Sequence, residues 1–365
     1  MISDPKISVI LITYNHEKYI AEAINSILLQ TYPDFQLIIV DDGSSDNTLK
    51  IIREYNDPRI IVVEQVNSGP SIALNTGIGK SSGKFIALMS GDDVSLPNRL
   101  MTQIEQIELQ NADMLFALPQ IIGPDSKILN NNISHVFFNH EFETTAELFR
   151  LLFYSGNFLC APTCFSRRSA IEKVGQFKRG MIQLQDFDYW VRACKNDLVI
   201  KLNKNPVLQY RFLFGANLSG HRNTNRILAE TKILYRSFFD HAPSKLLHDS
   251  FGEKISMDAA ENDRKLEIDK SFLLLGHSTL DIKAIGIERI IMQLEDDETY
   301  KILTTERNLD MAWFFELAMS NDPGFYYLIR KIKVGLIFFR NSFLRYMPFI
   351  SNFGRSKTSK YNNPR

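Results

Sequence analysis

Cysteine is scarce in this sequence, and its three residues cannot all pair within one chain. Cys160 and Cys164 have a spacing that is unusual for zinc ligands, and no histidine lies near them in the sequence. An odd and sparse cysteine count is typical of proteins from reducing compartments. We therefore expect Cys160, Cys164 and Cys194 to be buried free thiols.

An excess of charge of one sign is also absent, because 42 basic residues balance 42 acidic residues. A formal net charge of zero argues against nucleic acid as a partner. The chain has no run of the roughly 20 apolar residues that a membrane span requires. Its first residues do not resemble a secretory signal, because the apolar run behind them is short and has no cleavage site. We therefore expect a cytoplasmic protein.

What the sequence does contain, in its first hundred residues, is an alternation of strand and helix patterns. Helical spacing of apolar residues at 17–30, ended by Pro33, predicts a helix after the first strand. This alternation predicts an α/β fold with a mostly parallel sheet and right-handed crossovers. Continuous apolar runs predict its strands at residues 7–12, 37–40, 60–63 and 85–89.

Later parts of the chain have a different character. We expect a strand at 114–118, a loop over 121–143 and a helix at 145–153. Beyond about residue 226, long helical patterns of mixed charge continue to residue 322 without a clear strand signal. The predicted divisions of the chain are 1–110, 111–230, 231–322 and 323–365.

The segment 323–365 contains Lys and Arg but no Asp or Glu. On a helical wheel, Leu328, Ile332 and Leu336 share one face, and most basic residues lie opposite. Such a helix could bind an anionic membrane surface through residues 325–347, because each basic residue near that surface contributes about 1 kcal/mol. The alternative is a helix that packs on its own protein.

Pairs of polar residues follow three of the predicted strands. Ligands of parallel sheets bind beyond the carboxyl ends of the strands, which is where these pairs fall. A carboxylate there could accept a hydrogen bond from a base or a sugar hydroxyl, or it could simply cap the next helix. The pairs are Thr13–Tyr14, Asp41–Asp42 and Asp92–Asp93.

Asp92 and Asp93 are adjacent carboxylates at the end of a buried strand, where their charge needs compensation. Carboxylate oxygens suit Mg²⁺ or Mn²⁺, and such an ion commonly shares its ligand shell with phosphate oxygens. We therefore expect a divalent ion here, although a solvated turn before Pro97 is the plainer alternative.

Asp186 and Asp188 lie in the stretch QDFDYW, among apolar and aromatic neighbours. A partly desolvated carboxylate there could have a raised pKa and act as a general base, whereas helix capping is the alternative. The seven histidines form no cluster with metal-ligand spacing. His221 is the histidine nearest to other candidate residues, and an ordinary loop histidine is the alternative.

Taken in order, these stretches resemble the inverting family 2 glycosyltransferases, over about residues 5–220. The resemblance implies a GT-A (Rossmann-like) fold, a mostly parallel sheet flanked by helices. The helical patterns beyond residue 226, outside the resemblance, indicate a C-terminal helical extension. The matching stretches are ISVILITYNHEKYIAEAINSILLQTYPDFQLIIVDDGSSDNT, NSGPSIALNTGI, GKFIALMSGDDVSLPNRL, APTCFSRRSAIEKVGQF and QDFDYWVRA.

The resemblance also implies a role for each matching residue. Asp186 would deprotonate the acceptor hydroxyl as the catalytic base, and Asp93 would ligate Mn²⁺ or Mg²⁺, with His221 as a second metal candidate. Residues 1–110 would bind the nucleotide sugar, and residues 111–230 would bind the acceptor and carry the base. The donor-binding residues would be Thr13 and Tyr14 at the nucleobase, Asp41 and Asp42 at its edge, Asn67 and Asn75 along the sugar and phosphates, and Asp92 at the ribose or sugar.

The function implied is inverting transfer from a nucleotide sugar, favoured to be a UDP-sugar, to a glycan or lipid-linked glycan in surface-polysaccharide synthesis. The enzyme would act in the cytoplasm or at the inner face of the cytoplasmic membrane. Residues 231–322, outside the resemblance, could pack on the catalytic domain or form a homo-oligomer interface. Leu74 stands where the family often has Arg, and Gln185 where an acidic residue usually precedes the base. The motif Gln-x-x-Arg-Trp of processive members is absent, which favours transfer of one or a few sugars.

The sequence allows two alternative functions. One is a catalytically inactive nucleotide-sugar-binding or scaffold protein, which Leu74 and Gln185 keep open. The other is a nucleotidyltransferase, although the stretch ITYNHEKY lacks the glycines of a phosphate loop.

Overall fold

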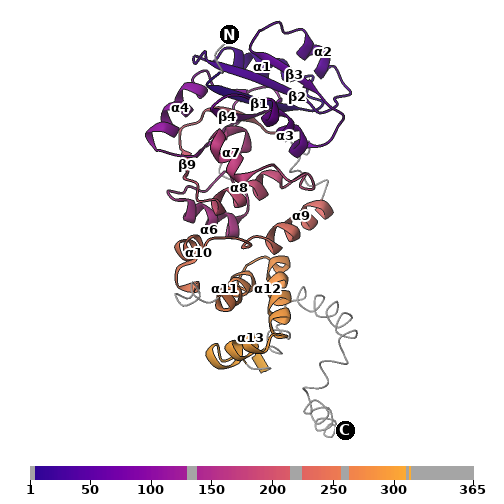
Figure 1. Cartoon of the computed structure of the whole chain (residues 1–365). Coiled ribbons are helices and arrows are strands. Elements are labelled where there is room, and N and C mark those ends of the chain that lie inside the picture. The colour runs from indigo at the N-terminus through magenta and orange to yellow at the C-terminus, as the bar shows by residue number, and fades with distance from the viewer. Residues whose placement is uncertain (1–4, 130–137, 214–223, 256–262, 310–311, 314–365) are drawn as a thin grey trace, which may run out of the picture. The chain divides into compact units, whose positions relative to one another are not determined.

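The computed structural model describes residues 5–129, 138–213, 224–255, 263–309 and 312–313 (Figure 1). The chain divides into two compact units, residues 1–266 and residues 267–365. Every candidate site residue lies in the first unit. The predicted divisions at 110, 230 and 322 stay predictions.

A seven-stranded sheet forms the centre of the first unit, in the order β3-β2-β1-β4-β8-β6-β9. Strand β8 is antiparallel to both of its neighbours, and the other neighbours in this sheet run parallel. This mixed but mostly parallel sheet confirms the predicted fold class. The strands are β1 (Ile7–Thr13), β2 (Phe35–Asp41), β3 (Ile60–Glu64), β4 (Phe85–Ser90), β6 (Met114–Ala117), β8 (Phe165–Arg167) and β9 (Ile200–Asn203).

Helices cover this sheet because apolar side chains recur at helical spacing along them. In α1, Ile20, Ile24 and Ile27 are buried in the same core as the strands. In α3, a Cβ atom added at Gly77 would come within 2.4 Å of a methyl carbon of Ile10, so a glycine lets this helix pack closely on β1. The helices are α1 (Ile20–Leu28), α2 (Thr48–Arg53), α3 (Pro70–Lys80), α4 (Arg99–Leu109), α6 (Thr145–Ser155), α7 (Arg168–Val174) and α8 (Gln185–Lys195).

A second, smaller sheet lies beside the end of β4, in the order β5-β10-β7. It is built from β5 (Val94–Ser95), β10 (Leu208–Arg211) and β7 (Gln120–Ile122). These strands have two to four residues, too few for an alternating pattern to be recognised. The sequence predicted none of them, and β9 was missed for the same reason.

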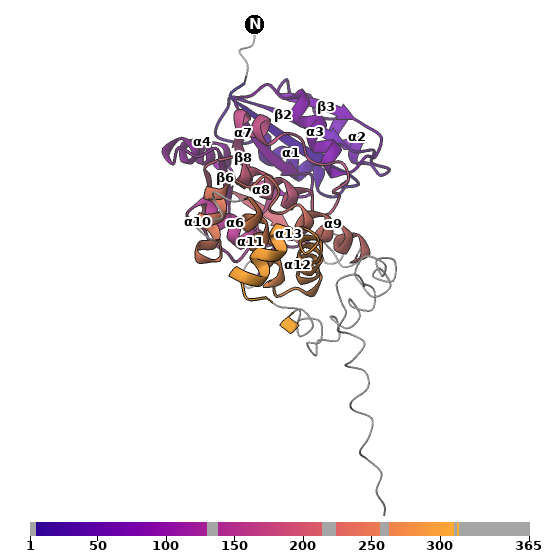
Figure 2. The same ribbon diagram turned by 60° about the horizontal axis from the view of Figure 1, so that its bottom comes forward.

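Helices follow the sheets for the rest of the described chain. The first unit contains α9 (Thr224–Arg236) and α10 (Ser244–Phe251). The ring of Tyr235 on α9 contacts Phe153 of α6, and the ring of Phe251 on α10 contacts both Phe149 and Phe153 of α6. Helices α6 and α8 lie side by side (Figures 1 and 2). The aromatic contacts therefore hold α9 close to the helix that carries Asp186.

The second unit contains most of α11 (Asp263–Leu275), together with α12 (Leu280–Gln293) and α13 (Asp297–Lys301). Its small core joins Leu275, Ile287 and Ile290. Residues 224–309 contain no strand wherever the structure describes them, as predicted. Within the described chain, none of the helices has the length and apolar character to span a membrane. Residues 325–347, the predicted membrane-binding helix, lie outside the described residues.

Candidate active site

The loops that follow β1, β2 and β4 meet at one edge of the large sheet. The backbone N–H of Asp42 donates to the Thr13 carbonyl at 2.9 Å, and that of Gly91 donates to the Ile12 carbonyl at 2.9 Å. A Cβ atom at Gly91 would lie 2.5 Å from Thr13 Oγ1, so only glycine permits this approach. Tyr14 is 45% exposed beside these loops. The structure thus brings together three of the predicted site segments.

Asp41 and Asp42 are both buried, but their carboxylates differ in their hydrogen bonds. Asp42 accepts hydrogen bonds from the backbone N–H groups of Ser68 and Gly69, both at 2.8 Å, and from Gln65 Nε2 at 2.6 Å. Asp41 Oδ2 accepts from the Ser44 N–H at 3.0 Å, whereas its buried Oδ1 has no hydrogen-bond partner. Asp42 therefore orders the loop before α3, and Asp41 keeps an acceptor atom available.

Asn67 and Asn75, predicted to lie along the donor, stand in different surroundings. Asn67 is exposed in the loop before α3, close to Gly43, whose φ of +74° and contact with the Asn67 backbone both require glycine. The Asn75 side chain exchanges two hydrogen bonds of 2.9 Å with the backbone of Phe177. Leu74 is buried. Asn75 therefore ties α3 to the loop before α8, and the donor-binding roles of both asparagines stay predictions.

The Asp92–Asp93 turn carries the predicted metal ligand. Asp93 is 1% exposed, and its Oδ1 accepts from the Arg211 backbone N–H at 2.8 Å. Its Oδ2 is buried without a hydrogen-bond partner. Burial, followed by the neighbouring charge of Asp92, raises the pKa of Asp93 well above its ordinary value. Asp92 itself accepts from the Ser90 hydroxyl.

An orphaned, buried carboxylate oxygen of this kind fits a divalent cation, which would remove the cost of holding the charge out of water. No cluster of three or more His, Cys, Asp or Glu residues with metal-binding geometry occurs within the described parts of the chain. His221, the second metal candidate, lies outside the described residues. Asp93 and Asp92 are thus the groups here that could hold Mn²⁺ or Mg²⁺.

Arg211, which the sequence analysis missed, fixes this turn from β10. Its buried guanidinium donates to the Asp92 carbonyl at 2.7 Å and to the Gly123 carbonyl at 2.9 Å. It also pairs with Glu22 at 2.6 Å and lies 4.5 Å over the Tyr19 ring. Nothing in the local stretch QYRF signals this role, because every partner is far away in the sequence.

Asp186 is the second residue of α8, and its carboxylate is held at both oxygens. Oδ1 accepts from the Phe187 backbone N–H at 2.8 Å, and Oδ2 accepts from Asn157 Nδ2 at 2.8 Å. Burial raises the pKa of Asp186 to about 6, against the opposing effect of these two hydrogen bonds. Such a carboxylate is a stronger base than an ordinary aspartate and is still mostly ionised near neutral pH.

The charges of Asp93 and Asp186 both act on the same buried thiol, Cys160. The pKa of Cys160 is raised well above its ordinary value by burial and then by the charge of Asp93, with a smaller contribution from Asp186. The loop that Asp42 orders approaches the loop before α8, since a Cβ at Gly69 would lie 3.9 Å from Ile182. All three cysteines are free and buried, as predicted.

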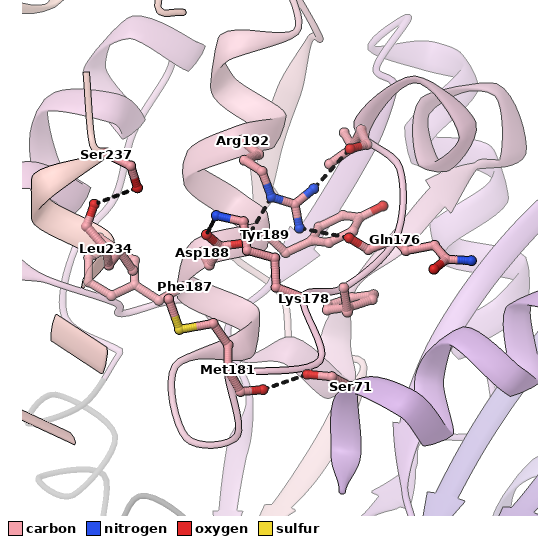
Figure 3. Close-up of polar contacts among 12 residues, drawn as sticks. Ser71, Gln176, Lys178, Met181, Phe187, Asp188, Tyr189, Arg192, Leu234 and Ser237 are labelled. Atoms are coloured by element: carbon pink, nitrogen blue, oxygen red, sulfur yellow. Dashed lines mark hydrogen bonds and ion pairs between the residues drawn. The ribbon is translucent and has the colours of Figure 1, made fainter. Parts of the chain in front are cut away.

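Asp188, the other candidate in QDFDYW, is a structural residue (Figure 3). It is buried between two cations, with Lys178 Nζ at 2.6 Å from Oδ1 and Arg192 Nε at 2.8 Å from Oδ2. Arg192 also donates to the carbonyls of Val174 and Gln176. Both oxygens of Asp188 are thus committed to fixing the loop before α8, which leaves Asp186 as the candidate base.

A mixed sheet with carboxylates at its strand ends is typical of nucleotide-sugar enzymes, and comparison with known proteins gives the family. Residues 8–175 match the model of glycosyl transferase family 2. An uncharacterised glycosyltransferase of Methanocaldococcus jannaschii is 31% identical over 216 residues, which are 57% of this chain and 71% of the relative. The chain belongs to glycosyl transferase family 2, and its predicted family is confirmed.

Two further proteins are similar to this chain. The UDP-Glc:α-D-GlcNAc-diphosphoundecaprenol β-1,3-glucosyltransferase WfgD of Escherichia coli is 28% identical over 201 residues, covering 55% of this chain and 74% of WfgD. The crystal structure of S. aureus TarS residues 1–349 in complex with UDP-GlcNAc superposes with a TM-score of 0.54 at 19% identity, covering 79% of this chain and 85% of that one. The latter similarity supports the GT-A fold. The family assignment favours a glycosyltransferase over a nucleotidyltransferase.

Proposed function

We propose that this protein transfers a sugar from a UDP-sugar to a hydroxyl group of a glycan or lipid-linked glycan, with inversion at the anomeric carbon. The observation that carries the proposal is the Asp186 carboxylate, which is partly buried at the start of α8 and is held at both oxygens by Asn157 and the Phe187 N–H. Burial raises its pKa to about 6. The E. coli relative, whose name describes a UDP-glucose donor and a diphosphoundecaprenol-linked acceptor, supports this choice of substrates.

In the proposed reaction, Asp186 accepts the proton of the acceptor hydroxyl while the hydroxyl oxygen attacks the anomeric carbon. The bond from that carbon to the diphosphate oxygen breaks, and UDP leaves. A single displacement of this kind inverts the anomeric centre and requires one base and no covalent nucleophile. Asn157 and the Phe187 N–H hold the carboxylate in place, so little reorganisation is needed at the moment of transfer.

Asp93, with Asp92 beside it, would hold Mn²⁺ or Mg²⁺. The ion, when bound, offsets the negative charge that develops on the leaving diphosphate. Arg211 contributes by fixing Asp93 Oδ1 through its backbone N–H, which leaves Oδ2 for the cation. The proposed donor-binding residues remain Thr13, Tyr14, Asp41, Asp42, Asn67, Asn75 and Asp92. Asp41 Oδ1, which is buried without a hydrogen-bond partner, is the proposed acceptor for a nucleobase N–H.

A lipid-linked acceptor would place the reaction at the inner face of the cytoplasmic membrane. Residues 325–347 are the proposed membrane contact, and residues 231–322 the proposed homo-oligomer interface. Both proposals rest on the sequence pattern.

The nucleotide specificity can be tested by thermal shift with a panel of nucleotide sugars and Mn²⁺. At a ligand concentration of about 100 times Kd, binding stabilises a protein by about 2.7 kcal/mol, which corresponds to a rise in Tm of roughly 5–10 °C for a domain of this size. We expect UDP-sugars to give the largest shift. GDP- and dTDP-linked forms of the same sugars are the controls, and a larger shift with either would contradict the UDP assignment.

The rate of transfer should depend on pH through Asp186. Because the base must be ionised and its pKa is about 6, kcat/KM should rise tenfold per pH unit below about 6 and level off above it. The rate at pH 5 should therefore be roughly one-tenth of the plateau. Donor binding measured over the same range is the control, and a transfer rate that is flat from pH 5 to 8 would exclude a base of this pKa.

A further inference from the structure

The loop that connects α7 to α8, residues 175–184, is held against the donor half of the protein. Ser71 Oγ, on α3, donates to the Met181 carbonyl at 2.6 Å (Figure 3). Asn75, one turn further along α3, holds the backbone of Phe177. Lys178 of the same loop pairs with Asp188 of α8. The path of the chain into α8 is therefore fixed at several points before it reaches Asp186.

The last three residues of this loop are held by a single buried carboxylate from α9. Glu230 is 3% exposed. Its Oε1 accepts from the Ile182 N–H at 3.1 Å, and its Oε2 accepts from the N–H groups of Gln183 and Leu184, both at 2.9 Å. Arg226, one turn earlier on α9, pairs with the same carboxylate at 3.2 Å. Three consecutive backbone N–H groups thus converge on Glu230.

These contacts fix the backbone that leads into α8 and include the N–H of its N-cap residue, Leu184. The first N–H groups of a helix lack partners within the helix, and a side chain at the N-cap usually accepts from them. The N-cap of α8 is Leu184, whose side chain cannot do so. The Leu184 N–H donates instead to the Glu230 carboxylate of α9, 46 residues further along the chain.

We infer that Glu230 is a positioning residue for catalysis, which sets the start of α8 and thereby the location of the Asp186 carboxylate. The inference rests on the proposed role of Asp186 as the base. Asp186 follows Leu184 by two residues, so a shift in the Leu184 backbone moves the base with it. Misplacement of a reacting group by about 1 Å can cost roughly 100-fold in rate, because proton transfer requires close and aligned atoms.

Glu230→Gln tests this role, because glutamine has the same shape but replaces one acceptor oxygen with an NH₂ donor that faces backbone N–H groups. We expect kcat for transfer to fall about 10- to 100-fold, while KM and Kd for the UDP-sugar stay within about twofold. Glu230→Asp keeps the carboxylate on a shorter side chain, and it should recover part of the lost kcat. A residue that only stabilises the fold would not lower kcat per folded molecule while leaving KM for the UDP-sugar unchanged.

Tyr235→Phe is the matched control on the same helix. It removes a buried hydroxyl that donates to the Phe153 carbonyl at 2.8 Å and leaves the Glu230 carboxylate in place. Both variants should lower Tm, whereas kcat per folded molecule should fall only in Glu230→Gln. If kcat is equal in the two variants, or if Glu230→Gln raises KM for the donor with an unchanged kcat, Glu230 does not position the base.

Asp186→Asn, assayed in parallel, separates this inference from the proposed function. If Asp186→Asn still transfers sugar at the normal rate, both the base assignment and the role of Glu230 are overturned. If Asp186→Asn is inactive while Glu230→Gln transfers at the normal rate, the base assignment stands and the positioning role alone is overturned.

Discussion

Asp186→Asn is expected to lower the rate of sugar transfer about 10²- to 10⁴-fold, the range that general-base catalysis supplies. The asparagine carbonyl oxygen can still accept from the Phe187 N–H, whereas the NH₂ group replaces the oxygen that accepted from Asn157. The amide cannot take a proton from the acceptor hydroxyl. The loss should therefore appear in kcat, with binding of the UDP-sugar unchanged by calorimetry.

Asp188→Asn is the control for this experiment, because it makes the same chemical change two residues away in the same helix. Asp188 is paired with Lys178 and Arg192, so the variant should lose thermal stability. Its kcat per folded molecule should stay within about tenfold of the normal value, well above that of Asp186→Asn. The opposite ranking of the two variants would move the base assignment from Asp186 to Asp188.

Asp93→Ala is expected to lower transfer about 10²- to 10³-fold and to abolish its stimulation by Mn²⁺, because the ion's stabilisation of the leaving diphosphate amounts to several kcal/mol. Binding of Mn²⁺ in the presence of UDP, measured by calorimetry, should be lost in parallel. This binding measurement does not depend on activity, so it tests the metal site even if the variant is inactive for another reason.

Asp125→Ala serves as the control for the metal experiment. Asp125 is an exposed carboxylate that pairs with Lys127, and its removal should leave Mn²⁺ affinity and transfer unchanged. If a chelator has no effect on the normal protein, or if Asp93→Ala binds Mn²⁺ as tightly as the normal protein does, the metal assignment is wrong.

The parts of the fold that could be predicted are those whose signal is local. Strands β1, β2 and β4 are buried on both faces, so their residues form continuous apolar runs that are visible in one window of sequence. Strands β5, β7, β9 and β10 were missed, because a short strand is stabilised by its neighbours in the sheet and not by its own pattern.

The site residues also divide into those with a local sequence signal and those without one. Asp93 and Asp186 stand in recognisable stretches, so the sequence identified them as candidates. Arg211 and Glu230 were missed because they act on backbone groups that are distant along the chain, and a lone Arg or Glu carries no local signal of such contacts. The sequence also could not reveal that Asp42 orders the loop before α3 while Asp41 keeps an unpaired oxygen.

The contacts of Arg211 also constrain the order in which the site can form during synthesis. Its partner Glu22 lies 189 residues earlier in the chain, and the Asp92 carbonyl lies 119 residues earlier. Contacts between residues so far apart in the sequence form late in folding. Closing a large loop lowers the conformational entropy of the chain, and this cost comes before the contacts that offset it have formed. The nucleotide-binding strands could therefore assemble on a ribosome-bound nascent chain, whereas the Asp92–Asp93 turn would reach its final geometry only after β10 has left the exit tunnel.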